Sequence, residues 1–399
     1  MTQRAASDLP ILIIGGGVAG LTLAQGLRLH SIPFRLFERQ PLTRSSQGHR
    51  FRISKDGKAA LDSVLSPQLQ ELLKQTAADS YPFEPRHVDA KKLDYAKPPP
   101  GDPDTMPVDR TWFRLLTTLD ISDAIEYEKD FESYQILDED EGVQVKFKDG
   151  SVACGRLLVG ADGVKSRIRK QLQPDRRLLD VERWVTWGRA PLTEELRKTV
   201  PQDLLSWCMY IDQEANVQLI VEPMTWSKCV RKETKTRLPD FDDYIYWVVC
   251  TAPFQYSDNL PKTATEKKQF LDKASETWHP ALRYLLDSAV YDLSTCIPVL
   301  SSKPDIEIRL VSQNARGRVT LIGDAVHSMS PMGGVGGDTA IRNAADLART
   351  VAGGITKGSI AEFEGRMETL AREKIEHSFR SGQRFWRGKA WPEYNEVDV

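Results

Sequence analysis

The sequence predicts an α/β protein with a parallel sheet, crossover helices and a second, mixed sheet. Three observations predict this fold class. An apolar segment, 11–14, leads into the turn "GGGVAG" (15–20) and then into a helical pattern. Two later apolar segments, 157–160 and 319–322, also run into turns with glycine and aspartate. Between these two segments, several aromatic stretches alternate in polarity, as strands of a half-buried sheet do.

The first 40 residues read as strand, turn, helix and strand, the pattern of a Rossmann-type unit. Apolar residues recur at helical spacing over 21–32, and "PFRLFERQ" (33–40) reads as a strand that ends at Glu38. Glu38 lies near the offset expected for an acid that binds ribose hydroxyls. A helix N-terminus offers N–H groups to a pyrophosphate. The pattern indicates a dinucleotide site, NAD or FAD, and the alternative is a structural βαβ unit. The glycines that fit G-x-G-x-x-G are Gly15, Gly17 and Gly20.

Composition limits the classes of protein. The chain has 399 residues, of which 40% are hydrophobic and 28% charged, with a formal net charge of −2. This balance gives no reason to expect nucleic acid or an acidic membrane as a partner. No apolar run approaches the ~18 residues of a membrane span. The five cysteines have no metal-ligand spacing and no signal peptide is evident, so we expect a cytoplasmic protein without a metal site.

Two further motifs indicate a family. One strand runs into "GADG" (160–163), and "RVTLIGDAVHSMSPMGGVGGDTAIRNAADLA" (318–348) places Gly323-Asp324 after another strand and a glycine turn before a helix. A strand-end aspartate suits a polyol hydroxyl, and a helix N-terminus suits an electron-rich carbonyl edge. With GxGxxG, DG and GD motifs in this order, nearly the whole chain resembles group A FAD-dependent monooxygenases of the para-hydroxybenzoate hydroxylase type. "PMGGVGG" and "FRSGQRFWRGKAW" are most similar to fungal members of secondary metabolism.

The resemblance implies how this chain holds the two halves of FAD. The three glycines of the first turn would bind the pyrophosphate, and Glu38 would bind the adenosine ribose. Arg110 would open a helix beside FAD, and Asp162 belongs to a motif associated with both FAD and the nicotinamide cofactor.

Four further residues are implied at the flavin half. Arg52 in "GHRFRIS" would contact this half, and Asp324 would bind the ribityl chain. Gly336 and Gly337 would place backbone N–H groups near the flavin carbonyl edge. For Arg52 and Arg110, the alternative is an exposed arginine at a helix end.

The resemblance also implies a discontinuous domain organisation. A Rossmann-type FAD-binding domain of the glutathione reductase type would be interleaved with a mixed-sheet substrate domain and followed by a C-terminal helix. The FAD-binding domain would comprise 8–75, 105–180 and 300–352. The substrate domain would comprise 76–104 and 181–299, and the helix and tail 353–399.

The aromatic stretches predict the class of substrate. Segments such as "RWVTWGRAP" (183–191) and "YIYWVVC" (244–250) would suit a flat aromatic or polycyclic molecule, although for any single aromatic the alternative is ordinary sheet core. Arg189 interrupts an aromatic strand. Some members of the resembling family bind a phenolate with an arginine in this region, and the alternative is a surface arginine.

The resemblance implies that NADPH, or alternatively NADH, reduces FAD. Dioxygen then forms a C4a-hydroperoxyflavin, which hydroxylates or epoxidises an electron-rich substrate. One alternative is a redox-neutral cyclase or small-molecule binding protein that retains the fold. Asp338 and Asn343 support it, because the family usually carries Asn and Asp at these two positions. A halogenase is disfavoured, because "WVTWGRAP" lacks the W-x-W-x-I-P spacing.

Overall fold

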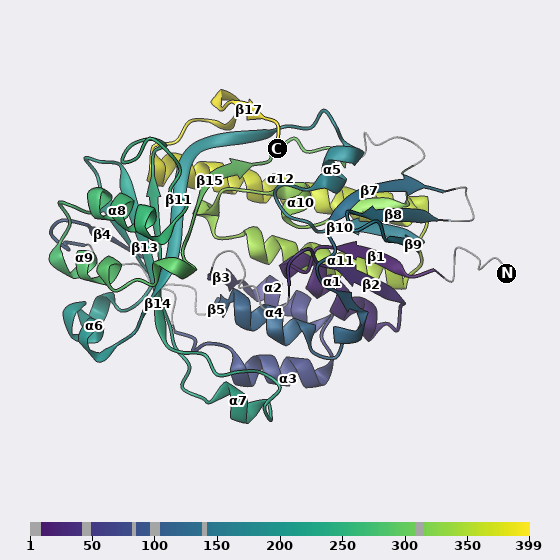
Figure 1. The fold of residues 1–399 in the computed structure, drawn as a ribbon, viewed down its shortest axis with the longest axis horizontal. Coiled ribbons are helices and arrows are strands. Elements are labelled where there is room, and N and C mark those ends of the chain that lie inside the picture. Colours follow the sequence, from purple (N-terminus) through teal and green to yellow (C-terminus); the bar gives the residue numbers. More distant parts are fainter. Residues whose placement is uncertain are drawn as a thin grey trace.

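A five-stranded parallel sheet forms one half of the computed structural model (Figure 1). The structure describes residues 9–41, 49–81, 85–95, 104–137, 142–308, 315 and 317–399. The predicted strand–turn–helix–strand unit is present. Its first strand, β1, lies at the centre between its second strand, β2, and the DG-motif strand β10, and the GD-motif strand β16 pairs with β10. In spatial order the strands are β16 (Val319–Leu321), β10 (Leu157–Gly160), β1 (Ile11–Ile14), β2 (Phe34–Phe37) and β6 (Ile125–Glu126).

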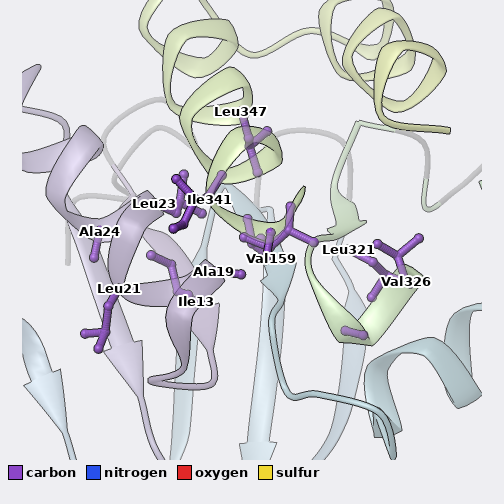
Figure 2. Packing of buried hydrophobic residues seen from close by; sticks show 14 of the residues in the cluster. Ile13, Ala19, Leu21, Leu23, Ala24, Val159, Leu321, Val326, Ile341 and Leu347 are labelled. Carbon is purple, nitrogen blue, oxygen red and sulfur yellow. The ribbon is translucent and has the colours of Figure 1, made fainter. Parts of the chain in front are cut away.

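Helices α1 (Val18–Leu29) and α11 (Gly336–Ala352) pack against each other and against this sheet. Figure 2 shows side chains of both helices meeting those of the strands, with Leu23, Ile341 and Val159 close together. These three side chains are fully buried. Burying a side chain of this size contributes about 1.5–3 kcal/mol, so this packing fixes where the glycine turn ahead of α1 lies.

The other half is a mixed sheet of seven strands (Figure 1). All of its pairs are antiparallel except β12–β4, and the 14-residue β11 also pairs with the C-terminal β17. The order is β15 (Thr295–Ser301), β11 (Leu178–Pro191), β14 (Tyr244–Thr251), β13 (Val217–Met224), β12 (Cys208–Asp212) and β4 (Arg86–Asp89), with β17 (Glu396–Val397) beside β11.

Alternation along β14 separates the two faces of this sheet. Tyr244, Tyr246 and Val248 pack into the core shared with the parallel sheet. Trp247 and Val249 face the opposite way, into a second core that includes residues of α8 (Ala264–Ala274) and α9 (Pro280–Asp287). The face that bears Tyr246 is therefore the face turned toward the parallel-sheet half.

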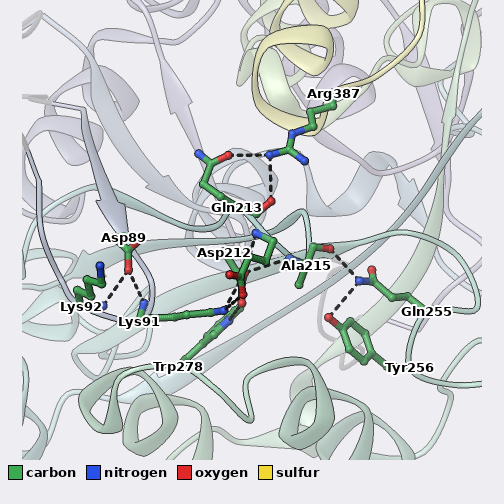
Figure 3. A network of polar contacts seen from close by, with 11 residues as sticks. Asp89, Lys91, Lys92, Asp212, Gln213, Ala215, Gln255, Tyr256, Trp278 and Arg387 are labelled. Atoms are coloured by element: carbon green, nitrogen blue, oxygen red, sulfur yellow. Dashed lines mark hydrogen bonds and ion pairs between the residues drawn. The ribbon is translucent and has the colours of Figure 1, made fainter.

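The hairpin between β12 and β13 is held by Asp212. Its Oδ1 accepts hydrogen bonds from the backbone N–H groups of Glu214 (3.1 Å) and Ala215 (3.0 Å). Its Oδ2 accepts one from Trp278 Nε1 (3.2 Å), and Lys91, in the loop after β4, lies 3.7 Å from Oδ1 (Figure 3). One buried carboxylate thus ties the far edge of the sheet to the segment between α8 and α9.

Two small sheets and the remaining helices complete the described chain. The ribbon of β3 (Arg50–Ile53) and β5 (Met106–Asp109) lies between the two halves, and β7 (Phe131–Ile136), β8 (Val143–Phe147) and β9 (Val152–Gly155) form an antiparallel sheet. The other α-helices are α2 (Lys55–Asp62), α3 (Pro67–Thr76), α4 (Arg110–Thr118), α5 (Arg167–Leu172), α6 (Glu194–Thr199), α7 (Val230–Glu233), α10 (Asp324–His327) and α12 (Lys357–Trp386).

The long helix α12 packs against α11 and also contacts β13, so it joins the two halves. The predicted domain boundaries stay a prediction, but β17 shows that the tail contributes a strand to the mixed sheet. Across the described residues, we find no helix whose length and apolar character would let it span a membrane.

Candidate cofactor site and the facing sheet

A cavity of about 260 Å³ opens at the carboxyl edge of the parallel sheet, where β1, β2 and β10 end. This edge is where open α/β sheets bind ligands. Three of its walls come from sequence motifs, namely the first glycine turn, the segment after β2 and the turn after β10. The lining residues with charged side chains are Glu38, Arg39, Arg110, Arg114, Lys129, Asp130, Asp162, Lys165 and Arg167.

The glycines of the first turn have different structural roles. Gly15 has φ +111°, and a Cβ there would lie 2.2 Å from the Ala161 carbonyl oxygen. At Gly20 it would lie 2.0 Å from the Gly15 oxygen. Both positions therefore require glycine for the close crossing of β1, α1 and the turn after β10. At Gly17, by contrast, no atom of the described chain lies within 4 Å of the added Cβ.

The N-terminus of α1 fits an anionic ligand. Gly17 is its N-cap, and within the described chain no side chain caps it and no acid lies in its first turn. Its first N–H groups and its positive dipole end are thus left for a ligand. The open space at Gly17 lies at the same place. A pyrophosphate matches this combination of charge and room.

Glu38 follows β2 and reaches back to the glycine turn. Gly16 N–H donates to its Oε2 (2.7 Å) and Gln40 N–H to its Oε1 (2.8 Å). The carboxylate lines the cavity and so holds the turn while facing the ligand space. Its spare acceptor positions suit the predicted ribose hydroxyls.

Asp162 lines the same cavity but also caps α5. Its carboxylate accepts hydrogen bonds from Ser166 Oγ (2.5 Å) and from Arg167 N–H (2.9 Å). Burial raises its pKa, and these hydrogen bonds oppose the rise. Asp162 of the DG motif therefore holds the start of α5 in place as well as lining the cavity.

Arg110 and Asp324 are close enough to interact, but only Arg110 is among the residues that line the cavity. Arg110 opens α4, lines the cavity, and stacks its guanidinium 5.3 Å from the centre of the Phe51 ring. Asp324 opens α10 and has an exposed side chain, although the next three residues are buried. The protein around it raises its pKa by desolvation, and the charge of Arg110 lowers it. The two side chains thus interact electrostatically.

Gly336 and Gly337 begin α11, as the pattern predicts. A Cβ at Gly337 would lie 2.7 Å from Phe51 Cδ2, whereas at Gly336 the nearest atom would be 3.6 Å away. Within the described residues no side chain caps this helix either. Its N–H groups are available on the side predicted to meet the flavin carbonyl edge.

Arg52 points to the mixed sheet and lies outside the cavity lining. Its guanidinium forms an ion pair with Glu222 of β13, and its Nε donates to Thr105 Oγ1 (3.1 Å). Arg50 pairs with Oε2 of the same carboxylate, and the Tyr81 hydroxyl donates to Oε1 at 2.6 Å, the oxygen that Arg52 also contacts. Glu222 has no exposed side-chain surface. The structure therefore places Arg52 in a buried network between the halves of the molecule.

Arg189 is not a surface arginine, since its guanidinium stacks 4.9 Å from the centre of the Tyr244 ring. Its Nε donates to His49 Nδ1 (3.2 Å). Tyr244 in turn donates to Asp109 Oδ2 (2.6 Å), and Asp109 caps α4, the helix that Arg110 opens. His49 and Glu222 were not predicted from the sequence. The one available signal was a charged residue inside the apolar strand pattern "VQLIVEPM".

Asp338 and Asn343 each have a local partner. Asp338 accepts hydrogen bonds from Ser54 N–H (2.8 Å) and Ser54 Oγ (2.9 Å), so its carboxylate faces the N-terminus of α2. Asn343 Nδ2 lies 2.8 Å from His327 Nε2, and both residues are buried. Burial lowers the pKa of His327 to about 4, which matches a neutral amide partner. These contacts give each residue a structural partner in the folded chain.

Comparisons with known proteins give the same family as the motifs. A family model described as an FAD binding domain matches residues 90–361. The dual O-methyltransferase/FAD-dependent monooxygenase elcB of Phaeosphaeria nodorum is 31% identical over 454 aligned positions, which cover 99% of this chain and 48% of that protein. The FAD-dependent monooxygenase dbaB of Emericella nidulans is 25% identical, with coverage of 95% and 97%.

Among solved structures, a candidate FAD-containing monooxygenase of Photorhabdus luminescens subsp. laumondii TTO1 superposes with a TM-score of 0.81. It is 26% identical, and the match covers 95% of this chain and 99% of that one. The chain spans about half the length of the first curated relatives that it matches.

Proposed function

The chain belongs to the family defined by this FAD binding domain, and from this premise we propose that it is an NADPH-dependent monooxygenase. The reaction takes an electron-rich aromatic or polycyclic substrate, NADPH, a proton and dioxygen. It returns the hydroxylated or epoxidised substrate, NADP⁺ and water. The observation that carries the proposal is the uncapped N-terminus of α1 beside open space at Gly17 and the carboxylate of Glu38.

FAD, when bound, supplies the redox chemistry, and the protein supplies binding, orientation and exclusion of water. N–H groups after Gly17 bind the pyrophosphate, and Glu38 orients the ribose. Asp324 and the N-terminus of α11 hold the flavin half. The inner face of the mixed sheet then supports an aromatic substrate with Tyr246, Val248 and Trp187.

Anaerobic stopped-flow reduction tests the proposal. FAD-loaded protein is mixed with NADPH or NADH, alone and with a panel of phenols, indoles and prenylated aromatics. We expect faster flavin bleaching with NADPH, and further acceleration by at least one panel member. An aerobic run with ¹⁸O₂ should then label the product with one heavy oxygen atom. Failure of both nucleotides to bleach the flavin with every panel member would contradict the proposal.

The variant Asp324→Ala tests the residue predicted to bind the ribityl chain. The substitution removes an exposed side chain at the start of α10. We expect it to lose FAD or turnover. A variant with parent-like FAD content and rate would remove Asp324 from the site.

A further inference from the structure

A polar group lies between the cofactor cavity and the mixed sheet. Arg189 on β11 and Glu222 on β13 are both cross-strand neighbours of Tyr246 on β14, so the three side chains share one face. His49 precedes β3 and faces this row, with its ring centre 6.5 Å from that of Tyr246. The His49 carbonyl oxygen accepts a hydrogen bond from Arg110 N–H (2.8 Å). Because Arg110 lines the cavity, this backbone hydrogen bond links His49 to the cofactor cavity, while the His49 ring faces the mixed sheet.

Arg189 fixes the tautomer of His49. A guanidinium can only donate, so His49 Nδ1 must accept the 3.2 Å hydrogen bond from Arg189 Nε. Burial and then the charge of Arg189 lower the pKa of His49 to about 3, so the ring is neutral at pH 7. A neutral imidazole whose Nδ1 accepts carries its proton on Nε2. His49 therefore presents a fixed Nε2–H donor.

This donor lacks an acceptor within the part of the chain that the structure describes. His49 is 4% exposed, and its Nε2 is buried without a hydrogen-bond partner. The Leu293 carbonyl faces the imidazole and raises its pKa, but it forms no hydrogen bond with Nε2 in the described chain. A buried donor without an acceptor destabilises the folded protein. An acceptor atom from a ligand would offset that cost.

Resting on the proposed function, we propose that His49 is a substrate-positioning residue whose Nε2–H donates a hydrogen bond to an acceptor oxygen on the aromatic substrate. The acceptor is a ring-attached carbonyl or phenolate oxygen. On the sheet side, the rings of Tyr244 and Tyr246 contact His49 edge-on, with ring centres 6.4 and 6.5 Å away. Arg189 positions His49 and adds a positive charge that also favours an oxygen acceptor. The site thus selects for an aromatic molecule with an oxygen at its rim.

Equilibrium dialysis of oxidised, FAD-loaded protein tests this proposal without turnover. The probes are 1-tetralone (carbonyl), 1-naphthol (phenol) and naphthalene (no oxygen). In the parent we expect the Kd of 1-tetralone or 1-naphthol to be about tenfold lower than that of naphthalene, the scale of one hydrogen bond. His49→Ala should abolish this preference, and any change in the Kd of naphthalene, which has no oxygen, measures the loss of the ring's packing alone.

Two further variants separate positioning from packing. His49→Gln keeps an N–H donor and should restore part of the preference. His87→Ala removes an exposed histidine of β4, on the far edge of the sheet, and should keep all of it. The pH dependence identifies the acceptor. Affinity for 1-naphthol that rises toward the pKa of its phenol indicates a phenolate, and a pH-independent preference for 1-tetralone indicates a carbonyl.

Three results would overturn the proposal. These are a parent that shows no preference for either oxygenated probe, a His49→Ala variant that retains the preference, and a His49→Ala variant that weakens the binding of all three probes equally. None of these results depends on NADPH or dioxygen. A lost preference in His49→Ala together with failed flavin reduction would contradict the proposed function alone.

Discussion

At the scale of single residues, Glu222 is the centre of a buried ion-pair network. It is a buried carboxylate that pairs with Arg50 and Arg52 and accepts from Tyr81. Burial costs each of these charges several kcal/mol, and their mutual attraction offsets that cost only while all partners remain. The three elements that carry them, β3, the segment after α3 and β13, are therefore tied together.

Glu222→Gln should lower the free energy of unfolding by about 3–5 kcal/mol, because two buried guanidinium groups lose their counter-charge. Urea unfolding of the FAD-loaded protein measures this change. Glu126→Gln is the matched control, since its 2.5 Å pair with Arg35 joins side chains that are 35% and 41% exposed. An exposed pair contributes about 0–1 kcal/mol. Similar losses in the two variants would show that the buried network is not specially stabilising.

Glu38→Ala should weaken FAD binding by about 1.5–3 kcal/mol, the scale of a hydrogen bond to a charged group. The corresponding rise in Kd is roughly 10- to 150-fold. Fluorescence titration of the apoprotein with FAD measures it. Glu38→Gln keeps one side-chain oxygen that can accept from Gly16 N–H, and should lose less. An unchanged Kd in Glu38→Ala would remove this side chain from the FAD site.

At the scale of elements, the first glycine turn has two positions without room for a Cβ, Gly15 and Gly20, and one position with open space, Gly17. The sequence predicts this turn, both flanking strands and α11, because their signals are local glycines and apolar runs. It could not predict the pairing of Arg52 with Glu222, because 170 residues separate them and strand order decides that they meet. His49 lacked a local signal for the same reason, since its donor, Arg189, comes from another sheet.

A pair of substitutions in the turn separates folding from binding. Gly17→Ala places a methyl group where no described atom lies within 4 Å, so stability should change by less than about 1 kcal/mol. The methyl group enters the ligand space, and FAD affinity should fall about tenfold or more, as overpacking costs about 1–3 kcal/mol. Gly20→Ala should instead lower the thermal midpoint of the apoprotein, because its Cβ would lie 2.0 Å from the Gly15 oxygen. Parent-like FAD affinity in Gly17→Ala would contradict the pyrophosphate assignment.

At the scale of the whole molecule, two buried imidazoles bear on how stability depends on pH. His49 lies between the mixed sheet and the cavity, and His327 lies beneath α11, where it contacts Asn343. Burial lowers the pKa of both rings, to about 3 and about 4. Both therefore stay neutral in the folded protein while the unfolded chain, with an ordinary histidine pKa near 6.5, takes up protons first.

The resulting pH dependence has a definite sign. Below pH 6.5 the unfolded state binds more protons than the folded state, so stability falls as the pH falls toward the folded pKa values of about 3 and 4. Each buried histidine should cost about 2 kcal/mol between pH 7 and pH 5. His327→Gln removes one of them and should reduce the drop by about that amount, as measured by urea unfolding at the two pH values. His30→Gln, at an exposed position, is the control and should keep the parent slope. If His327→Gln also keeps that slope, protonation of His327 does not oppose folding and its burial is not what makes the protein sensitive to acid.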